Sequence, residues 1–266
     1  MAPSSPFRMR TRQHARSISF PSRTYPLLPQ LDEQLNRLKE NGATSLSSLG
    51  DRLSGLQDLH LSVDDLLQMP HIQHSLTTVQ ESNKKLADDV LDKYIKVLDA
   101  CTASKGIFSQ AKFDVQGLLS SLRRRKDATD ASGKYLASRK KDKRAIQMAL
   151  KDLKNVKISE GNDQLEAIDL FNGVQSATIS VLESSLTYIM GTKARSSLIS
   201  KLIHKEGTSK NEFDQINEAL GVMDIESTQR HLEEMELKIQ DIEEGLDCLF
   251  KHLIKTRVLL LNMLSY

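Results

Sequence analysis

The chain has 266 residues, enough for one large domain or two smaller ones, with 39% apolar, 27% charged and 5% aromatic residues. Leu dominates the apolar set and Trp is absent, which favours helices because strands draw on aromatic and β-branched residues. The net charge of +2 is too small to indicate nucleic-acid or membrane binding by itself. No apolar window of about 18 residues, the length that crosses a bilayer, occurs.

The first 29 residues differ in composition from the rest of the chain. Residues 1–25 carry five Arg and no acid, and five of the six prolines fall before residue 30. No helical periodicity is visible there. The sequence therefore predicts a disordered arm over residues 1–29 and an all-α domain over residues 30–266.

Apolar residues recur at three-four spacing along the first part of that domain, which is typical of helices. A helix is expected from Gln30 to Glu40, and a second begins with Thr44 or Ser45 as N-cap. Pro70 ends or kinks this second helix. A long helical stretch follows from Ser75 to Leu122, with Gly106 as a candidate break.

The second half of the chain predicts four more helical segments. One covers about Asp127 to Lys157, and another runs from about Leu165 past Gly191 to Ile203. A short acidic helix contains Phe213 to Leu220. With short connections and several long helices, the predicted fold is an elongated antiparallel bundle.

The last segment, from Ser227 to Tyr266, has the strongest pattern. Its large apolar residues alternate by three and four without a break, which predicts one helix with a continuous heptad seam. We expect this apolar seam to pack the bundle, with a homodimer through it as the alternative. The seam consists of Leu232, Met235, Ile239, Ile242, Leu246, Leu249 and Leu253.

Charge is unevenly distributed along the helical domain. Residues 123–144 hold ten Lys and Arg against three Asp, and residues 212–247 hold twelve acids against Arg230 and Lys238. We interpret these as complementary solvated faces that lie near each other. Nucleic-acid binding is not expected, because Tyr135 is the only aromatic residue in the basic stretch. A weak membrane-surface contact through the basic apolar end, Phe250 to Leu264, is an alternative.

The sequence offers no arrangement that indicates catalysis. It has no glycine-rich phosphate loop, and no nucleophile–histidine pair can be proposed from spacing. His71 and His74 read as helix-end residues rather than metal ligands. Cys101 and Cys248 form no framework, so reduced, buried thiols in an intracellular, cytoplasmic protein are expected. A non-enzymatic protein without cofactor or metal is therefore the expectation.

One linear motif lies in the arm. Arg16, Ser17, Ser19 and Pro21 fit the pattern Arg-Ser-x-Ser-x-Pro, which resembles the ligand motif of 14-3-3 proteins when the second Ser is phosphorylated. Arg16 suits a basophilic kinase, and the phosphate adds about two negative charges for an Arg cluster on the reader. Pro21 would turn the chain out of an extended groove. The alternative is an organelle-targeting arm, in which such a match arises by chance.

Both ends of the chain resemble a plant-specific family, the BYPASS-like proteins. The likeness rests on His14 to Arg23, on the Leu-rich helix from Leu31, and on Leu249 to Asn262, and it extends over about residues 10 to 264. Thr24-Tyr25-Pro26 stands where a Ser-His-Pro ending is expected. The resemblance supplies no catalytic residues.

The resemblance implies a role in root and shoot development, in which the founding member restrains a mobile, root-derived signal that arrests shoots. We therefore expect a non-enzymatic interaction protein with an arm regulated by phosphorylation. An enzyme or small-molecule carrier acting on that signal, with a cavity in the bundle, is the alternative. Family names often include a chloroplast label, which makes the chloroplast the alternative location.

Overall fold

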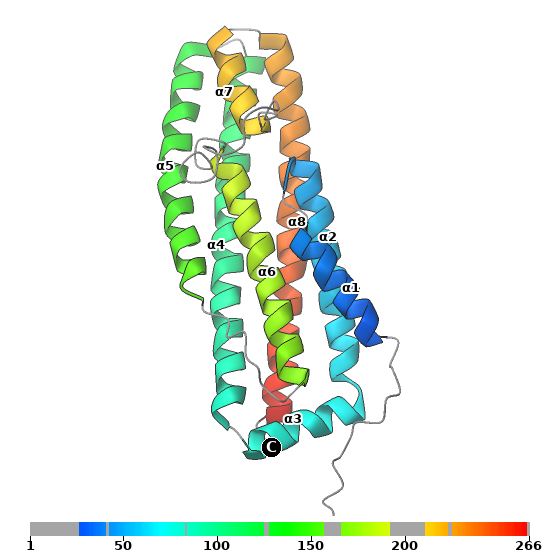
Figure 1. Ribbon diagram of the computed structural model, residues 1–266. Helices are drawn as coiled ribbons and strands as arrows, with labels where there is room; N and C mark the ends of the chain where they lie inside the picture. The colour runs from blue at the N-terminus through cyan, green and yellow to red at the C-terminus, as the bar shows by residue number, and fades with distance from the viewer. Residues whose placement is uncertain are drawn as a thin grey trace, which may run out of the picture.

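The computed structural model describes residues 27–40, 43–82, 84–124, 128–156, 166–191, 211–222 and 225–264. The described residues form eight helices and no strand, in an elongated bundle (Figure 1). This confirms the predicted all-α class. The helices are α1 (Leu27–Glu40), α2 (Leu46–Leu67), α3 (Pro70–Ser82), α4 (Lys84–Arg123), α5 (Ala128–Lys154), α6 (Glu166–Met190), α7 (Glu212–Val222) and α8 (Ile225–Leu264).

The long helices α2, α4, α6 and α8 follow the long axis of the bundle, and α8 packs mainly against α4 and α2. Helix α5 lies along α4 and α6, and α1 packs on α2 and α6. Helix α3 crosses one end of the bundle, and α7 lies at the other (Figure 1). Apolar residues from all eight helices form one core cluster.

Neighbouring helices are not all antiparallel. Helix α8 runs antiparallel to α4 but parallel to α2, as the colours in Figure 1 show. Two contacts between α2 and α8 show this direction, because the residue numbers rise in both helices from the first contact to the second. Leu53 lies against Gly245, and Asp64 accepts a hydrogen bond from Thr256.

Several helix ends follow from local sequence. Ser45 caps α2 as predicted, since its hydroxyl accepts from the Ser48 amide at 3.0 Å and the Ser48 hydroxyl accepts from the Ser45 amide at 2.9 Å. Pro70 begins α3 as a separate helix, where its missing N–H costs nothing. Helix α1 begins three residues before the expected Gln30, because Pro29 is tolerated in a first turn.

Two glycines behave differently from expectation. Gly106 lies inside the continuous α4, so the candidate break there was wrong; packing on both sides of it holds the helix. Gly191 ends α6 with a φ of +93°, so the expected continuation past it was wrong. Only glycine adopts that backbone conformation readily.

Candidate functional site

The seven residues of the apolar seam are buried by the chain itself. None is more than 1% exposed, and α8 lies between α2 and α4, which cover the seam without a second copy. The arm motif (Arg16, Ser17, Ser19 and Pro21) lies outside the described residues.

The basic stretch and the acidic stretch meet only in part. Helix α5, which holds most of the basic stretch, packs mainly on α4 and α6. The acidic face of α8 instead pairs with α4: Arg123 reaches Glu233 at 2.7 Å, and Lys112 reaches Glu243 at 3.0 Å. Among the described residues, the two stretches therefore lie near each other at two points only: Arg123 pairs with Glu233, and Arg139 lies 4.4 Å from the centre of the Phe213 ring.

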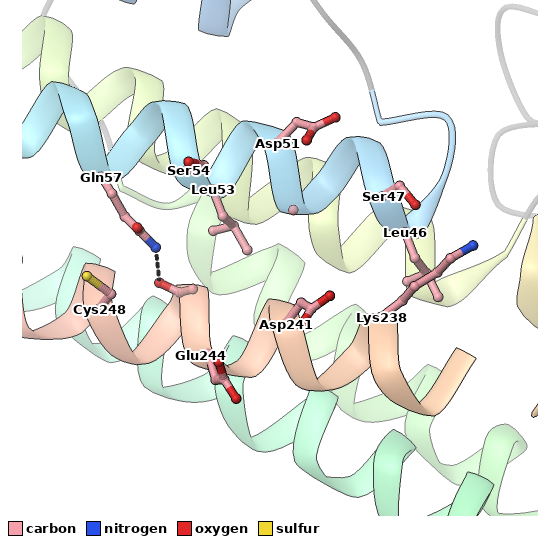
Figure 2. A pocket seen from close by; sticks show the side chains of 12 residues that line it. Leu46, Ser47, Asp51, Leu53, Ser54, Gln57, Lys238, Asp241, Glu244 and Cys248 are labelled. Carbon is pink, nitrogen blue, oxygen red and sulfur yellow. Dashed lines mark hydrogen bonds between the residues drawn. The ribbon is translucent and has the colours of Figure 1, made fainter. Parts of the chain in front are cut away.

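A groove opens between the first half of α2 and the middle of α8 (Figure 2). The backbones approach closely here, because a Cβ on Gly245 would lie 3.3 Å from Leu53. The Gln57 amide donates to the Gly245 carbonyl at 3.2 Å, which satisfies a helix carbonyl beside the groove. Lys238 and Asp241 lie between the helices in Figure 2. The groove has a volume of about 450 Å³ and is lined by Leu46, Ser47, Gly50, Asp51, Leu53, Ser54, Gln57, Lys238, Asp241, Glu244, Gly245 and Cys248.

A second hollow of about 270 Å³ adjoins this groove and shares Lys238 with it. It is formed by the start of α2, by α7 and by the first half of α8. Lys238 lies 3.7 Å from Glu212, which also accepts from the Leu46 amide at 3.2 Å. The hollow is lined by Thr44, Ser45, Glu212, Gln215, Ile216, His231, Glu234, Met235 and Lys238.

Farther along α2 and α8, the contact contains a buried carboxylate. Asp64 is 1% exposed, and three groups of α8 surround it. The Thr256 hydroxyl donates to Oδ1 at 3.1 Å, while His252 Nδ1 and Lys255 Nζ lie 3.3 and 3.0 Å from Oδ2. Both carboxylate oxygens therefore have partners, as a buried charge requires.

His60, one turn before Asp64, extends this polar cluster towards α6. Its Nε2 lies 3.1 Å from the Thr178 hydroxyl, which donates its own proton to the Val174 carbonyl at 2.8 Å. His60 must therefore donate from Nε2, and its buried Nδ1 has no partner. Burial, and then the charge of His252, lower the His60 pKa to about 4, against the opposing charge of Asp64.

Helix α4 contributes the fully buried Tyr94, whose hydroxyl also lacks a partner. Burial and the negative charge of Asp64 raise the Tyr94 pKa. One residue earlier, Lys93 lies 2.6 Å from Asp89 and donates to Asn172 of α6 at 3.3 Å. We call Asp64, His60, His252, Lys255, Thr256, Thr178 and Tyr94 the polar centre.

The sequence reading missed the polar centre. Three of its members stand at apolar positions of α2 and α8: His60 and Asp64 follow Leu53 and Leu56, and Thr256 follows Leu253 in the seam. Polar residues at such positions are the signal that could have found it. The sequence does not show that the polar residues of α2 and those of α8 face each other. That depends on how the two parallel helices are aligned.

A separate cluster of polar side chains caps the end of α6. The buried Arg139 donates to the Ile189 carbonyl and lies 4.4 Å from the centre of the Phe213 ring. The Asn211 amide donates to the Tyr188 carbonyl at 2.8 Å. These contacts satisfy carbonyls that the helix end leaves free, so the cluster is explained by the fold.

Among the described residues, no group of three or more His, Cys, Asp or Glu could hold a metal ion. Cys101 is buried and Cys248 half-buried, and both are free thiols. None of the described helices combines the length and the apolar character that a membrane span needs. At the end of α8, Ile254 and Val258 are exposed.

Comparison with known proteins identifies the family. No curated protein and no solved structure matches the chain. A family model described as "Protein BPS1" matches residues 52–263, which takes in α3 to α7 whole, most of α2, and nearly all of α8. The match includes the C-terminal motif, Leu249 to Asn262, and begins after the N-terminal one; it confirms the family, and the chain belongs to the BPS1, or BYPASS-like, family.

Proposed function

We propose that the chain is a non-enzymatic interaction protein that acts in root and shoot development, with a bundle that serves as a rigid body and an arm that recruits 14-3-3 proteins when phosphorylated. The observation that carries this proposal is the burial of the apolar seam inside one chain. Because α2 and α4 cover the apolar seam within one chain, partner proteins must bind the arm or the outer faces of the bundle. Membership of the BPS1 family supports the developmental part.

The polar centre supports a structural role for its residues. Both oxygens of Asp64 have partners from α8, and the hollows described above are open surface grooves rather than enclosed chambers. A carboxylate that is already saturated is poorly placed to take a proton from a substrate.

The 14-3-3 proposal is tested with the full chain phosphorylated by a basophilic kinase. We expect isothermal titration with a 14-3-3 protein to show binding that the unphosphorylated chain lacks. Ser19→Ala should abolish binding, while Ser5→Ala, in the same arm, should not. Equal binding by the Ser19→Ala chain would refute the motif.

The developmental role is tested by genetics in a plant that lacks its own BYPASS-like gene. Expression of the wild-type chain should restore shoot growth, and Ser19→Ala should restore it only in part if the arm acts through 14-3-3 proteins. No rescue by the wild-type chain would contradict the role. Equal rescue by both would keep the role and remove the phosphorylated arm from it.

A second candidate function is a small-molecule carrier or enzyme acting on the mobile signal. The observation that favours it is the pair of unpartnered buried groups, His60 Nδ1 and the Tyr94 hydroxyl. Mass spectrometry of the chain purified natively from plant tissue would test it. A small molecule that is retained by the wild type and lost in Tyr94→Phe would support the carrier, and an empty wild type would count against it.

A third candidate is a peripheral membrane protein. Ile254 and Val258 are 42% and 47% exposed beside Lys251 and Lys255, and apolar residues interleaved with cations suit an anionic surface. Sedimentation with anionic liposomes should fall in Ile254→Ser/Val258→Ser. Unchanged sedimentation would remove this candidate.

A further inference from the structure

The two hollows along α8 form one elongated surface between His231 and Cys248, joined at Lys238. We call it the α2–α8 groove. Its floor is apolar, because Leu46, Leu53 and Met235 are buried beneath it. At about 1.5 Å per helical residue the groove is about 25 Å long, which matches about eight residues of extended chain at about 3.3 Å each.

The rims of the α2–α8 groove are acidic. Asp51 stands on the α2 side, Glu244 points away on the α8 side, and Asp241 lies between the helices (Figure 2). Glu234 adds a fourth carboxylate in the adjoining hollow. Lys238 is close to Glu212. Within the described part of the chain, Asp51, Glu234 and Asp241 have no cationic partner, so the groove carries uncompensated negative charge.

The segment that precedes α1 has the complementary composition. It contains no acid, and Ile18 and Phe20 interleave with its polar residues. It is attached to α1, which packs on α2, the helix that forms one wall of the groove. Its 26 residues reach about 85 Å when extended, more than the about 60 Å length of α8. Its five cations are Arg8, Arg10, Arg12, Arg16 and Arg23.

We propose that the unphosphorylated arm, residues 8–23, binds in the α2–α8 groove of its own chain. The arginines pair with the acidic rims, and Ile18 or Phe20 contacts the apolar floor. A tethered segment needs little affinity, because the attachment supplies a high effective concentration. A phosphate on Ser19 adds about two negative charges, which repel the acidic rims and release the arm. This last step rests on the proposed phosphorylation of the arm, whereas the docking itself does not.

Protease protection of the full chain tests the docking. An arginine-specific protease cuts the arm at a rate that follows the released fraction. We expect the variant Asp51→Asn/Asp241→Asn/Glu244→Gln to lose the arm about fivefold faster than wild type. Raising the salt concentration should speed cleavage of the wild type only, since salt screens exposed charges.

The matched control removes three exposed carboxylates elsewhere, in Asp92→Asn/Asp99→Asn/Asp152→Asn, and should be cut at the wild-type rate. Equal cleavage of the groove variant and wild type would overturn the proposal. A control that is cut as fast as the groove variant would also overturn it, because the effect would then come from net charge.

Cys248 gives an independent readout, because it lines the groove and Cys101 is buried. A thiol-linked photoreactive probe on Cys248 should crosslink to residues 8–23 of the same chain, as mass spectrometry of the monomer would show. Crosslinks to a second copy, or only to neighbouring helices, would overturn the intramolecular docking.

The two proposals fail separately. If Ser19→Ala loses 14-3-3 binding but its arm is still protected from the protease, the result bears on the phosphorylated arm alone and leaves the docking proposal standing. An unprotected arm in a chain that still binds 14-3-3 proteins when phosphorylated would remove the docking and keep the proposed function.

Discussion

The contact between α2 and α8 is made in two different ways along its length. In the half towards Ser45, the helices touch through Gly245 and Leu53, and the side chains around the contact leave an open acidic groove. In the half towards Leu67, the buried Asp64 is enclosed by Thr256, His252 and Lys255 of α8. The first half leaves an open surface, and the second fixes the register of the two helices.

The same apolar seam of α8 is buried in both halves of its contact with α2. Ile242 and Leu246 are fully buried in the half that carries the groove, and Leu253 is fully buried in the other half. What differs is the row of residues beside the seam. Small residues there leave the surface open, and the ion pair between the buried Asp64 and the half-exposed Lys255 closes it.

The largest expected effect comes from breaking the seam that both halves share. Ile242→Asp/Leu246→Asp places two uncompensated charges in the core, which costs several kcal/mol per charge against a typical total stability of about 5–15 kcal/mol. We expect the chain to lose its helical circular-dichroism signal at 25 °C. Leu237→Asp, at a position on the same helix that is 66% exposed, should remain folded. A soluble, helical double variant would show that the seam is not the core.

A pH change should weaken the half that holds the polar centre. The His60 pKa of about 4 lies below its ordinary 6.5, so the unfolded chain binds the proton more readily. Stability therefore falls as the pH drops from about 6.5 to about 4, by on the order of 3 kcal/mol for a shift of this size. Urea midpoints at pH 7 and pH 4.5 measure this loss.

His60→Gln should remove that part of the pH dependence, whatever it costs at pH 7. His231→Gln, which changes an exposed side chain of α8, is the matched control and should keep the wild-type slope. An unchanged slope in His60→Gln would mean that His60 does not carry the effect.

Enlarging Gly245 should separate the helices in the groove half. A Cβ there already lies 3.3 Å from two atoms of Leu53, so Gly245→Leu overpacks the contact and should cost about 1–3 kcal/mol. Gly117→Leu, where a Cβ meets nothing within 4 Å, should stabilise the chain by about 0.5–1 kcal/mol through helix propensity. Chemical denaturation of both variants tests the difference, and two changes of the same sign would contradict it.

The smallest expected effect on stability comes from the Thr256 hydroxyl. Thr256→Val keeps the shape of the side chain but leaves Oδ1 of the buried Asp64 without its donor, at a cost of about 1–2 kcal/mol. The control is Thr102→Val on α4, an exposed hydroxyl that bonds only to the Leu98 carbonyl, where less than about 0.5 kcal/mol is expected. A loss at Thr102 as large as at Thr256 would show that the hydroxyl at Thr256 has no special role.

Much of the fold could be predicted from the sequence, because its signals are local. Three-four spacing located the helices, and Ser45 and Pro70 marked boundaries that the structure confirms. The errors at Gly106 and Gly191 have a shared cause. Whether a glycine continues or ends a helix depends on what packs around it, as in the close approach of Asp214 to Gly191.

The sites were harder to predict because they depend on which helices become neighbours. The partner of Asp64 is 192 residues away in the chain, and nothing local pairs them. The groove was invisible for the same reason: Asp51 and Asp241 look like ordinary solvated positions until α2 and α8 lie side by side. The arm motif, in contrast, is entirely local, and it was read without knowledge of the fold.

The long sequence separation between α2 and α8 has a consequence for synthesis on the ribosome. Helix α2 emerges well before α8, because Asp64 and its partner Thr256 are 192 residues apart in the chain. At about 5–20 residues per second, the side of α2 that α8 covers stays uncovered for about 10–40 s. Nascent chains of this protein should therefore depend on chaperones until α8 leaves the exit tunnel, and folding should be limited by this long-range closure rather than by helix formation.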